Sequence, residues 1–195
     1  NVAESEYLYL LSDDDYLNVS ELYKLLDYIK LTKKDFYIST YSEQGKSRGR
    51  AFKSISASSV YKSDFVYTSI LFSGLIFKVS SFNISTSEID FLKNCIYSQV
   101  YLVAKFFKAS QDFTCFHGDT IVIGGEGKNY FGTNSSSSTL DSKELSDRQS
   151  ILSNFVYQKR LLKVVKYIDE NLFEGAYNNF KNAYSIRLVG YFIRA

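Results

Sequence analysis

The chain opens on a compact apolar run at residues 7–11 that stops at a serine and three aspartates. A short apolar run bounded by polar residues predicts a buried strand of a parallel or mixed sheet. Ser20 is then expected to cap a helix that reaches about Lys30. Its apolar positions recur at helical spacing, at Leu22, Leu25, Leu26 and Ile29. The acids therefore lie on a strand-to-helix loop, at the edge of an α/β sheet where ligands bind.

The same reasoning divides the rest of the chain into alternating elements. Further strands are predicted at residues 36–41, 65–72, 75–79 and 120–123, and the polar stretch 42–50 is predicted to be a flexible loop. A long helix is expected at 88–108, with capping residues at 85–87. Two more helices are expected at 147–170 and 176–193. This order predicts an α/β fold, with a mixed sheet flanked by helices and a helical C-terminal extension.

A serine-rich stretch separates the two parts of the chain. Such a composition buries too little apolar surface to order itself, so residues 133–146 are predicted to be a loop or linker. The prediction assigns residues 1–132 to an α/β domain and residues 147–195 to the helical extension. A chain of 195 residues is long enough for this arrangement.

Charge and hydropathy narrow the classes of function. The net charge is only +2 and the basic residues are dispersed, so no nucleic-acid-binding surface is indicated. No signal peptide opens the sequence, and the longest apolar stretch is too short to cross a bilayer. We expect a cytoplasmic protein with two reduced cysteines, although a disulfide stays an alternative. Contact with the inner face of a membrane is a second alternative, through a basic helix face formed by Lys159, Arg160, Lys163 and Lys166.

The triple aspartate suggests a cation site. Three adjacent carboxylates repel one another unless a cation offsets their charge, and Mg²⁺ and Mn²⁺ prefer carboxylate oxygens. Alternate residues of an extended turn point the same way, so Asp13 and Asp15 would face one ligand while Asp14 faces elsewhere. The competing interpretation is a solvated acidic turn before a helix. The position directly after a buried strand favours the cation site.

Residues 6–17, with the sequence EYLYLLSDDDYL before a leucine-rich helix, resemble the DXD region of family 2 glycosyltransferases with the GT-A fold. Residues 70–77 are similar to the strand near the acceptor site of that family. The resemblance extends from Glu4 to Ile123 as a pattern, and is nearest to bacterial surface-polysaccharide enzymes of the abequosyltransferase type. Only the DXD segment is specific.

The resemblance implies a metal-dependent transfer of a sugar from a nucleotide-sugar donor to a saccharide or lipid-linked acceptor. Asp13 and Asp14 would bind the donor, and Asp15 with Asp13 would hold Mg²⁺ or Mn²⁺. The nucleotide-base half of the family's domain precedes its DXD motif, so the chain is expected to be a fragment, inactive in isolation. Lys46, Arg48 and Arg50 would contact a diphosphate or a phospholipid-linked acceptor, unless they belong to an ordinary solvated loop.

The sequence departs from the family where a carboxylate base is expected. Tyr97 and Gln99 occupy that acceptor-side position, and an amide cannot take a proton. Asp119 is the preferred candidate base, with Asp90, Asp112 and Glu126 as alternatives, unless the reaction retains configuration and needs no such base. His117 beside it is interpreted as an ordinary surface histidine.

Two other classes of function stay open at this point. A degenerate transferase that only binds a carbohydrate or a partner protein would account for Gln99. An unrelated metal-dependent phosphoryl-transfer enzyme would act on nucleotides that carry no sugar.

Overall fold

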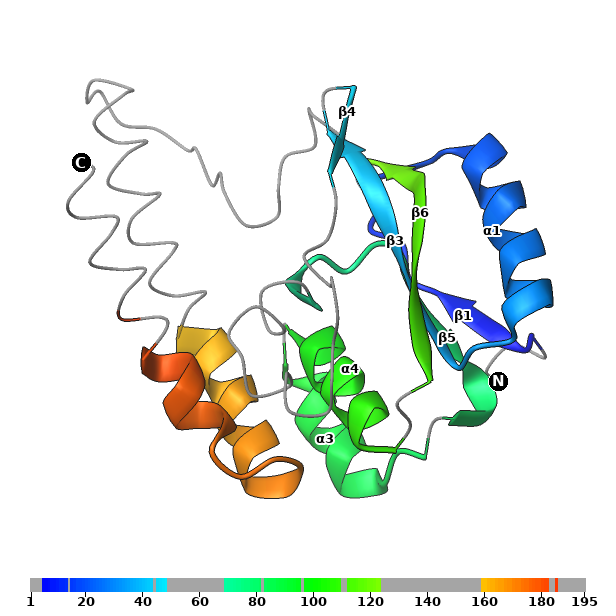
Figure 1. Ribbon diagram of the computed structural model, residues 1–195. Coiled ribbons are helices and arrows are strands. Elements are labelled where there is room, and N and C mark those ends of the chain that lie inside the picture. Colours follow the sequence, from blue (N-terminus) through cyan, green and yellow to red (C-terminus); the bar gives the residue numbers. More distant parts are fainter. Residues whose placement is uncertain are drawn as a thin grey trace, which may run out of the picture.

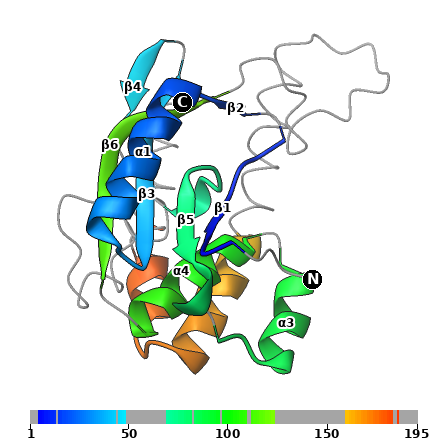
Figure 2. The same ribbon diagram turned by 90° about the vertical axis from the view of Figure 1, so that its right-hand side faces the viewer.

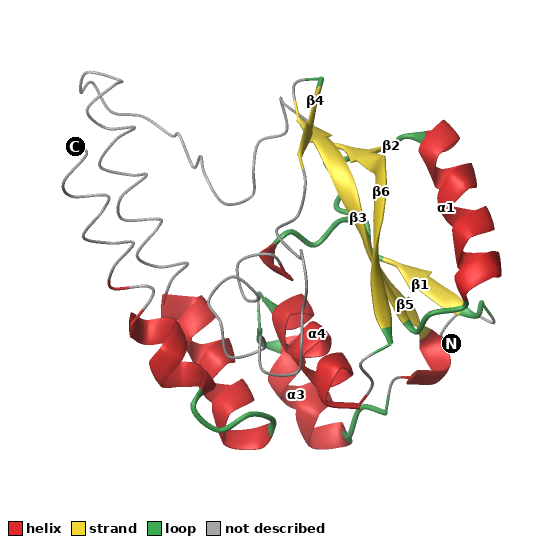
Figure 3. Ribbon diagram, in the orientation of Figure 1, coloured by secondary structure: helices red, strands yellow, loops and turns green. Residues whose placement is uncertain are grey.

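A computed structural model describes the chain at residues 5–13, 15–43, 45–48, 69–81, 83–95, 97–109, 112–123, 159–182 and 185. Its strands form one mixed six-stranded sheet in the order β1-β5-β3-β6-β2, with β4 paired to β3 (Figure 1). The strands are β1 (Tyr7–Tyr9), β2 (Tyr16–Leu17), β3 (Phe36–Glu43), β4 (Lys46–Arg48), β5 (Leu75–Lys78) and β6 (Phe113–Val122). Helices cover both faces of the sheet (Figure 3). The predicted α/β fold with a mixed sheet is therefore confirmed.

Successive side chains of the central strands β3 and β5 point to opposite faces of the sheet, so the apolar core forms two clusters. Phe36 pairs with Phe77 and Ile38 with Leu75, and all four belong to the larger apolar cluster. Tyr37 and Ile76 form the pair between them and belong to the smaller cluster on the opposite face. This is the period-two arrangement of a sheet that is buried on both sides.

Helix α1 (Val19–Thr32) covers the face with the smaller cluster, where Leu25 and Ile29 pack against Tyr37 and Ile76 (Figure 2). The predicted helix is confirmed, but its cap is Asn18 and not Ser20. The Asn18 side chain accepts a hydrogen bond from the Glu21 N–H, and the Ser20 hydroxyl donates to Asn18. Asparagine and serine are comparable caps, so sequence preference alone could not separate them.

The opposite face is covered by α3 (Thr86–Lys93), α4 (Ser98–Ala109) and helical residues 159–171 and 176–182. Leu161, Val165 and Ile168 from the predicted C-terminal stripe are buried in the same cluster as Phe36 and Phe106. These C-terminal helices therefore complete the core of the sheet. The cationic residues of the first one, from Lys159 to Lys166, are exposed as predicted. The linker predicted at 133–146 lies outside the described residues.

Three predicted elements differ from the structure. The single helix at 88–108 is two helices, because the Asn94 side-chain amide donates to the Asp90 carbonyl and closes α3. The loop at 42–50 contains the hairpin β3–β4, which turns at Gly45 with φ of 74°. The strand at 120–123 begins at Phe113. Of the strand predicted at 65–72, the described residues Ser69 and Ile70 are helical.

Neither Cys95 nor Cys115 forms a disulfide, and both side chains are half-buried. Burial raises the pKa of the Cys95 thiol, which keeps it protonated at neutral pH. Among the described helices, none combines the length and the apolar character that crossing a bilayer requires.

Candidate functional site

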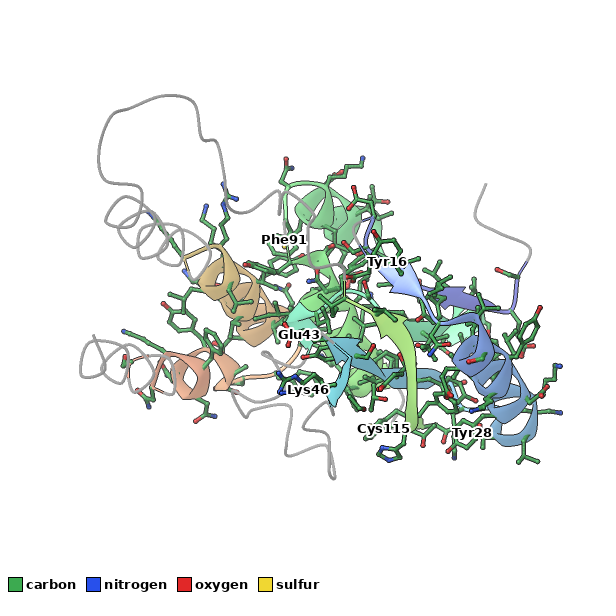
Figure 4. The ribbon with its side chains drawn as sticks, turned by 90° about the horizontal axis from the view of Figure 1, so that it is seen from above. Tyr16, Tyr28, Glu43, Lys46, Phe91 and Cys115 are labelled. Atoms are coloured by element: carbon green, nitrogen blue, oxygen red, sulfur yellow. The ribbon has the colours of Figure 1, made fainter. Side chains whose placement is uncertain are left out.

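Three strands end at the same edge of the sheet. β3 and β6 are parallel, and β1 and β3 are both antiparallel to β5, so β1, β3 and β6 run in one direction. The carboxyl ends of β3 and β6 lie at the top of Figure 1, and Figure 4 views the molecule from that side; β1 ends lower, level with Tyr37 of β3. Ligands of α/β sheets bind at such edges.

The acid turn, residues 12–15, spans this edge. The chain leaves β1 at one margin of the sheet and re-enters it as β2 at the other margin. Within the turn, the Asp15 N–H donates to the Ser12 carbonyl at 3.3 Å. Asp13 is exposed and Asp15 is half-buried, whereas Asp14 lies outside the described residues. The two described carboxylates predicted to bind metal therefore both lie at the carboxyl ends of the strands, Asp13 exposed and Asp15 half-buried.

A buried serine anchors the acid turn to the sheet. The Ser73 hydroxyl accepts a hydrogen bond from the Ser12 N–H at 2.9 Å and donates to Asp15 Oδ2 at 2.5 Å. Ser73 is fully buried directly before β5. In the sequence, Ser73 and Gly74 are marked only by their place between two predicted strands, 65–72 and 75–79. No sequence signal links residue 73 to residue 15, because the contact depends on β1 and β5 being neighbours.

The described residues fit a divalent cation that is shared with substrate phosphates. Among them, no three histidine, cysteine, aspartate or glutamate side chains converge on one point. Mg²⁺ commonly keeps several waters and binds one or two carboxylates together with substrate phosphates. Asp13 and Asp15 supply such a donor set, while a closed all-protein cage is not formed by this part of the chain.

Asp119 lies on the same edge, three residues before the end of β6. Its carboxylate accepts a hydrogen bond from the Ser47 hydroxyl of β4 at 2.8 Å, so it is held beneath the β3–β4 hairpin. Of the alternative bases, Asp112 precedes β6 at the opposite edge and pairs with Lys34 at 2.6 Å. Asp90 is on α3 and pairs with Lys93, and Glu126 lies outside the described residues. Asp119 is thus the described candidate at the acid-turn edge.

Tyr97 and Gln99 lie at the beginning of α4. The Gln99 side chain is buried, and its Nε2 donates to the Ile70 carbonyl at 2.8 Å. Tyr97 is half-buried at the margin of the larger apolar cluster. The Gln99 amide therefore ties α4 to the segment before β5, which is a structural role at the position where the family resemblance implies a catalytic carboxylate.

The described cationic side chains predicted to contact a diphosphate lie on the β3–β4 hairpin. Lys46 pairs in register with Glu43, and Figure 4 shows the two residues beside each other on the hairpin. Arg48 forms an ion pair with Glu43 at 3.3 Å. Both cations are exposed, and Arg50 lies outside the described residues. The hairpin is thus an exposed, partly neutralised basic element near Asp119.

The side of β6 that faces α1 carries a shallow hollow of about 440 Å³. Its lining includes Glu21, Lys24, Tyr28 and His117. His117 is exposed, in agreement with its interpretation as a surface histidine. A Cβ at Gly118 would clash with the Phe116 ring and with Glu21 Oε2, so this glycine leaves room for both side chains.

Hydroxyl groups line the sheet beneath the edge. Tyr9 hydrogen-bonds Thr120 at 2.8 Å, and the Thr120 hydroxyl donates to Ser39 at 2.6 Å. Thr40, next along β3, differs: its hydroxyl oxygen is buried without a partner within the described part of the chain. A buried hydroxyl with no hydrogen bond costs stability.

We therefore expect Thr40→Val to raise the free energy of unfolding by about 1 kcal/mol, because valine has the same shape and no hydroxyl to desolvate. Urea denaturation monitored by circular dichroism measures the change. Thr120→Val is the matched control. It removes a hydroxyl that bonds both Tyr9 and Ser39 and is expected to destabilise the protein. A destabilised Thr40→Val variant would show that this hydroxyl has a partner.

Comparisons with known proteins give a partial structural match. No protein-family model matches the chain, and no curated protein sequence matches it. A crystal structure of S. aureus TarS 1-349 is similar with a TM-score of 0.42 and 15% identity, over 62% of this chain and 36% of that one. A second crystal structure of S. aureus TarS gives a TM-score of 0.40 and 14% identity, over 62% and 22% respectively. The chain thus spans about a third of the first structure and less of the second.

Proposed function

We propose that the chain is part of a metal-dependent glycosyltransferase that moves a sugar from a nucleotide-sugar donor to a saccharide or lipid-linked acceptor. The observation that carries the proposal is the position of the acid turn. Its carboxylates lie across the edge where three strands end, and one of them is hydrogen-bonded to a buried residue of the sheet. An acidic turn that serves only solvation has no need of such an anchor.

The carboxylates of the acid turn would bind the metal ion and the nucleotide-sugar donor. Asp15 and Asp13 would hold Mg²⁺ or Mn²⁺, with Asp13 and Asp14 on the donor side. The cation, when bound, offsets the charge that develops on the departing diphosphate. Lys46 and Arg48 would add positive charge near the phosphates from the β3–β4 hairpin.

Asp119 would act on the acceptor in an inverting reaction. The acceptor oxygen forms a bond to the anomeric carbon, and the bond from that carbon to the diphosphate oxygen breaks with its electron pair on the phosphate. The proton of the acceptor hydroxyl passes to the Asp119 carboxylate. Ser47, which hydrogen-bonds this carboxylate, would orient it. A retaining reaction would not need this base, and Asp119→Asn would then keep its activity.

The acceptor and the biological setting follow from the family resemblance. We propose an abequosyltransferase-like member of family 2, with the GT-A fold, that acts in bacterial surface-polysaccharide synthesis of the O-antigen type. A lipid-linked acceptor would place the protein at the cytoplasmic face of a membrane. The exposed basic residues between Lys159 and Lys166 would contact anionic lipids there.

Replacing Asp15 with asparagine tests the proposal. In the full-length protein, we expect Asp15→Asn to lower the metal-dependent turnover of nucleotide sugars by about 100-fold, because the amide oxygen carries no net charge. Release of nucleoside diphosphate from a panel of nucleotide sugars, with and without Mn²⁺, measures this loss.

The matched control for this experiment is Asp27→Asn, which removes an equally charged but exposed carboxylate that pairs with Lys30 on α1. This variant is expected to keep full turnover. The proposal is wrong if the Asp15→Asn protein turns over donor with the same metal dependence as the wild type.

Gln99 favours a second candidate function, a non-catalytic module that binds a carbohydrate or a partner protein. The buried amide occupies the place of the family's base and bonds the Ile70 carbonyl. Gln99→Glu separates the two candidates. Donor turnover by the wild type supports the transferase. Saccharide binding without turnover, together with no activity in Gln99→Glu, supports the module.

A further inference from the structure

We infer that Ser73 is a positioning residue that orients the Asp15 carboxylate toward a divalent cation. The inference rests on the proposed function, since it concerns the same cation. It assigns a role to a residue outside the acid turn, about sixty positions away in the sequence.

The two hydrogen bonds of Ser73 fix the direction of its hydroxyl proton. A serine hydroxyl has one proton to donate and two lone pairs to accept with. The Ser12 N–H uses a lone pair at 2.9 Å, and the single proton points to Asp15 Oδ2 at 2.5 Å. One atom thus holds both the beginning and the end of the acid turn, and it presents a donor to the charged form of Asp15.

The backbone around Ser73 is held in turn by two strands. The Gly74 N–H donates to the Leu10 carbonyl of the chain leaving β1, and the Gly74 carbonyl accepts from the Ser39 N–H of β3. Gly74 has φ of 79°, a conformation that favours glycine. Ser73 is therefore held through its neighbour Gly74 against β3 and the chain leaving β1, and its hydroxyl links this part of the sheet to Asp15.

A fixed carboxylate binds a cation more tightly than a mobile one, because less conformational freedom is lost when the cation binds. Hydrogen bonds to metal-binding carboxylates commonly change metal affinity by 10- to 100-fold when they are removed. The buried position of Ser73 also keeps water from competing for the Asp15–Ser73 hydrogen bond. A positioning role for its hydroxyl therefore explains why the buried residue 73, just before the apolar strand β5, is a serine.

The test compares Mn²⁺ binding by the wild type and Ser73→Ala, with inorganic pyrophosphate as the phosphate partner. Electron paramagnetic resonance of free Mn²⁺ gives the dissociation constant. We expect Ser73→Ala to bind about 10-fold more weakly. The ¹³C chemical shift of the Asp15 side-chain carboxyl group should also change, because it reports directly on the lost hydrogen bond.

Two further variants separate positioning from stability. Ser73→Cys keeps the side-chain volume with a weaker donor, so it should give intermediate affinity, and it replaces Ser73→Ala if that variant does not fold. Thr40→Val removes a buried hydroxyl from β3 and should leave both the Mn²⁺ affinity and the Asp15 carboxyl shift unchanged. A lower melting temperature with unaltered Mn²⁺ affinity in the Ser73 variants would make Ser73 purely structural and overturn the inference.

The outcome for Asp15→Asn distinguishes this inference from the proposed function. If Asp15→Asn loses Mn²⁺ binding while the Ser73 variants keep it, the inference about Ser73 is wrong and the metal site stands. If Asp15→Asn binds Mn²⁺ and pyrophosphate as the wild type does, the metal site itself is wrong. Loss of affinity in both Asp15→Asn and Ser73→Ala supports the two together.

Discussion

Replacing Phe36 with alanine is expected to lower the free energy of unfolding by about 3–5 kcal/mol. Phe36 is fully buried at the centre of the sheet. Its ring stacks on Phe77 with centroids 4.7 Å apart and contacts Phe106 and Phe107 of α4 at 5.1 and 6.0 Å. Truncation removes all three contacts and leaves a cavity between the sheet and the helix.

Urea denaturation followed by tyrosine fluorescence measures this loss. Because small domains are stable by only about 5–15 kcal/mol, Phe36→Ala should shift the midpoint strongly or prevent folding. Tyr23→Ala on α1 is the control: this aromatic side chain is 67% exposed, and its loss should cost about 0.5 kcal/mol or less. Equal effects of the two substitutions would contradict the described core.

The second large effect is a loss of stability in acid that depends on Glu88. The Glu88 carboxylate joins α3 to α4, because it accepts hydrogen bonds from Lys105 at 2.5 and 2.6 Å and also from Tyr101. Burial by itself would raise the pKa of Glu88. The hydrogen bonds from Lys105, Tyr101 and Ser85 outweigh burial and lower the pKa from 4.5 to about 2.

The direction of the pH dependence follows from this lowered pKa. The folded protein binds the Glu88 proton more weakly than the unfolded chain, so Glu88 stabilises the fold fully above about pH 4.5. This contribution is lost as the pH falls toward 2. Since one pKa unit corresponds to about 1.4 kcal/mol, a shift from 4.5 to about 2 limits the loss to about 3.5 kcal/mol, and screening by solvent makes it smaller.

Urea denaturation at pH 7, 4.5 and 2.5 tests the expectation with two variants of α3. Glu88→Gln should be destabilised at pH 7 and should lose less stability than the wild type between pH 4.5 and 2.5. Asp90→Asn is the control, because the Asp90 side chain is 69% exposed and its ion pair within the described part of the chain is with Lys93 of the same helix. A steep acid loss that persists in Glu88→Gln would assign the effect to other carboxylates.

The predictions from the sequence agree best with the structure where the interacting residues lie within one helix. Of the predicted apolar positions of α1, Leu25 and Ile29 are buried and Leu22 is half-buried, whereas Leu26 is exposed. Ser85 caps α3 in the predicted region, with Glu88 completing a capping box. These features depend on residues three or four positions apart, so the sequence contains the whole interaction.

The predictions were less accurate where a strand forms by pairing with a segment that is distant in the sequence. The start of β6, from Phe113 to Asp119, alternates poorly and includes a glycine, yet it pairs with β3 across two register shifts. The β3–β4 hairpin lies in a stretch whose polar composition predicts a loop. In both cases hydrogen bonds to β3 hold the segment as a strand. The amino-acid composition of the segment does not show which strand it pairs with.

The candidate site shows the same division. The acid turn, its place after an apolar strand and the absence of a carboxylate at Gln99 are all evident from residue order. The position of the turn across the common edge of β1, β3 and β6 depends on the order of strands in the sheet. Ser73 and Ser47 reach Asp15 and Asp119 only through that order.

The sequence by itself determined the α/β class, the burial of Leu25 and Ile29 on α1 and the place of the acid turn directly after an apolar strand, because each depends on local spacing. The predicted strand-to-helix loop was wrong in one respect: β2 lies between the acid turn and α1. Only the tertiary structure decided which polar side chains surround those aspartates. The hydroxyl of Ser73 and the carboxylate of Asp15 meet at 2.5 Å although 58 positions separate them. Such a contact follows from the pairing of β1 with β5, which local spacing along the chain does not encode.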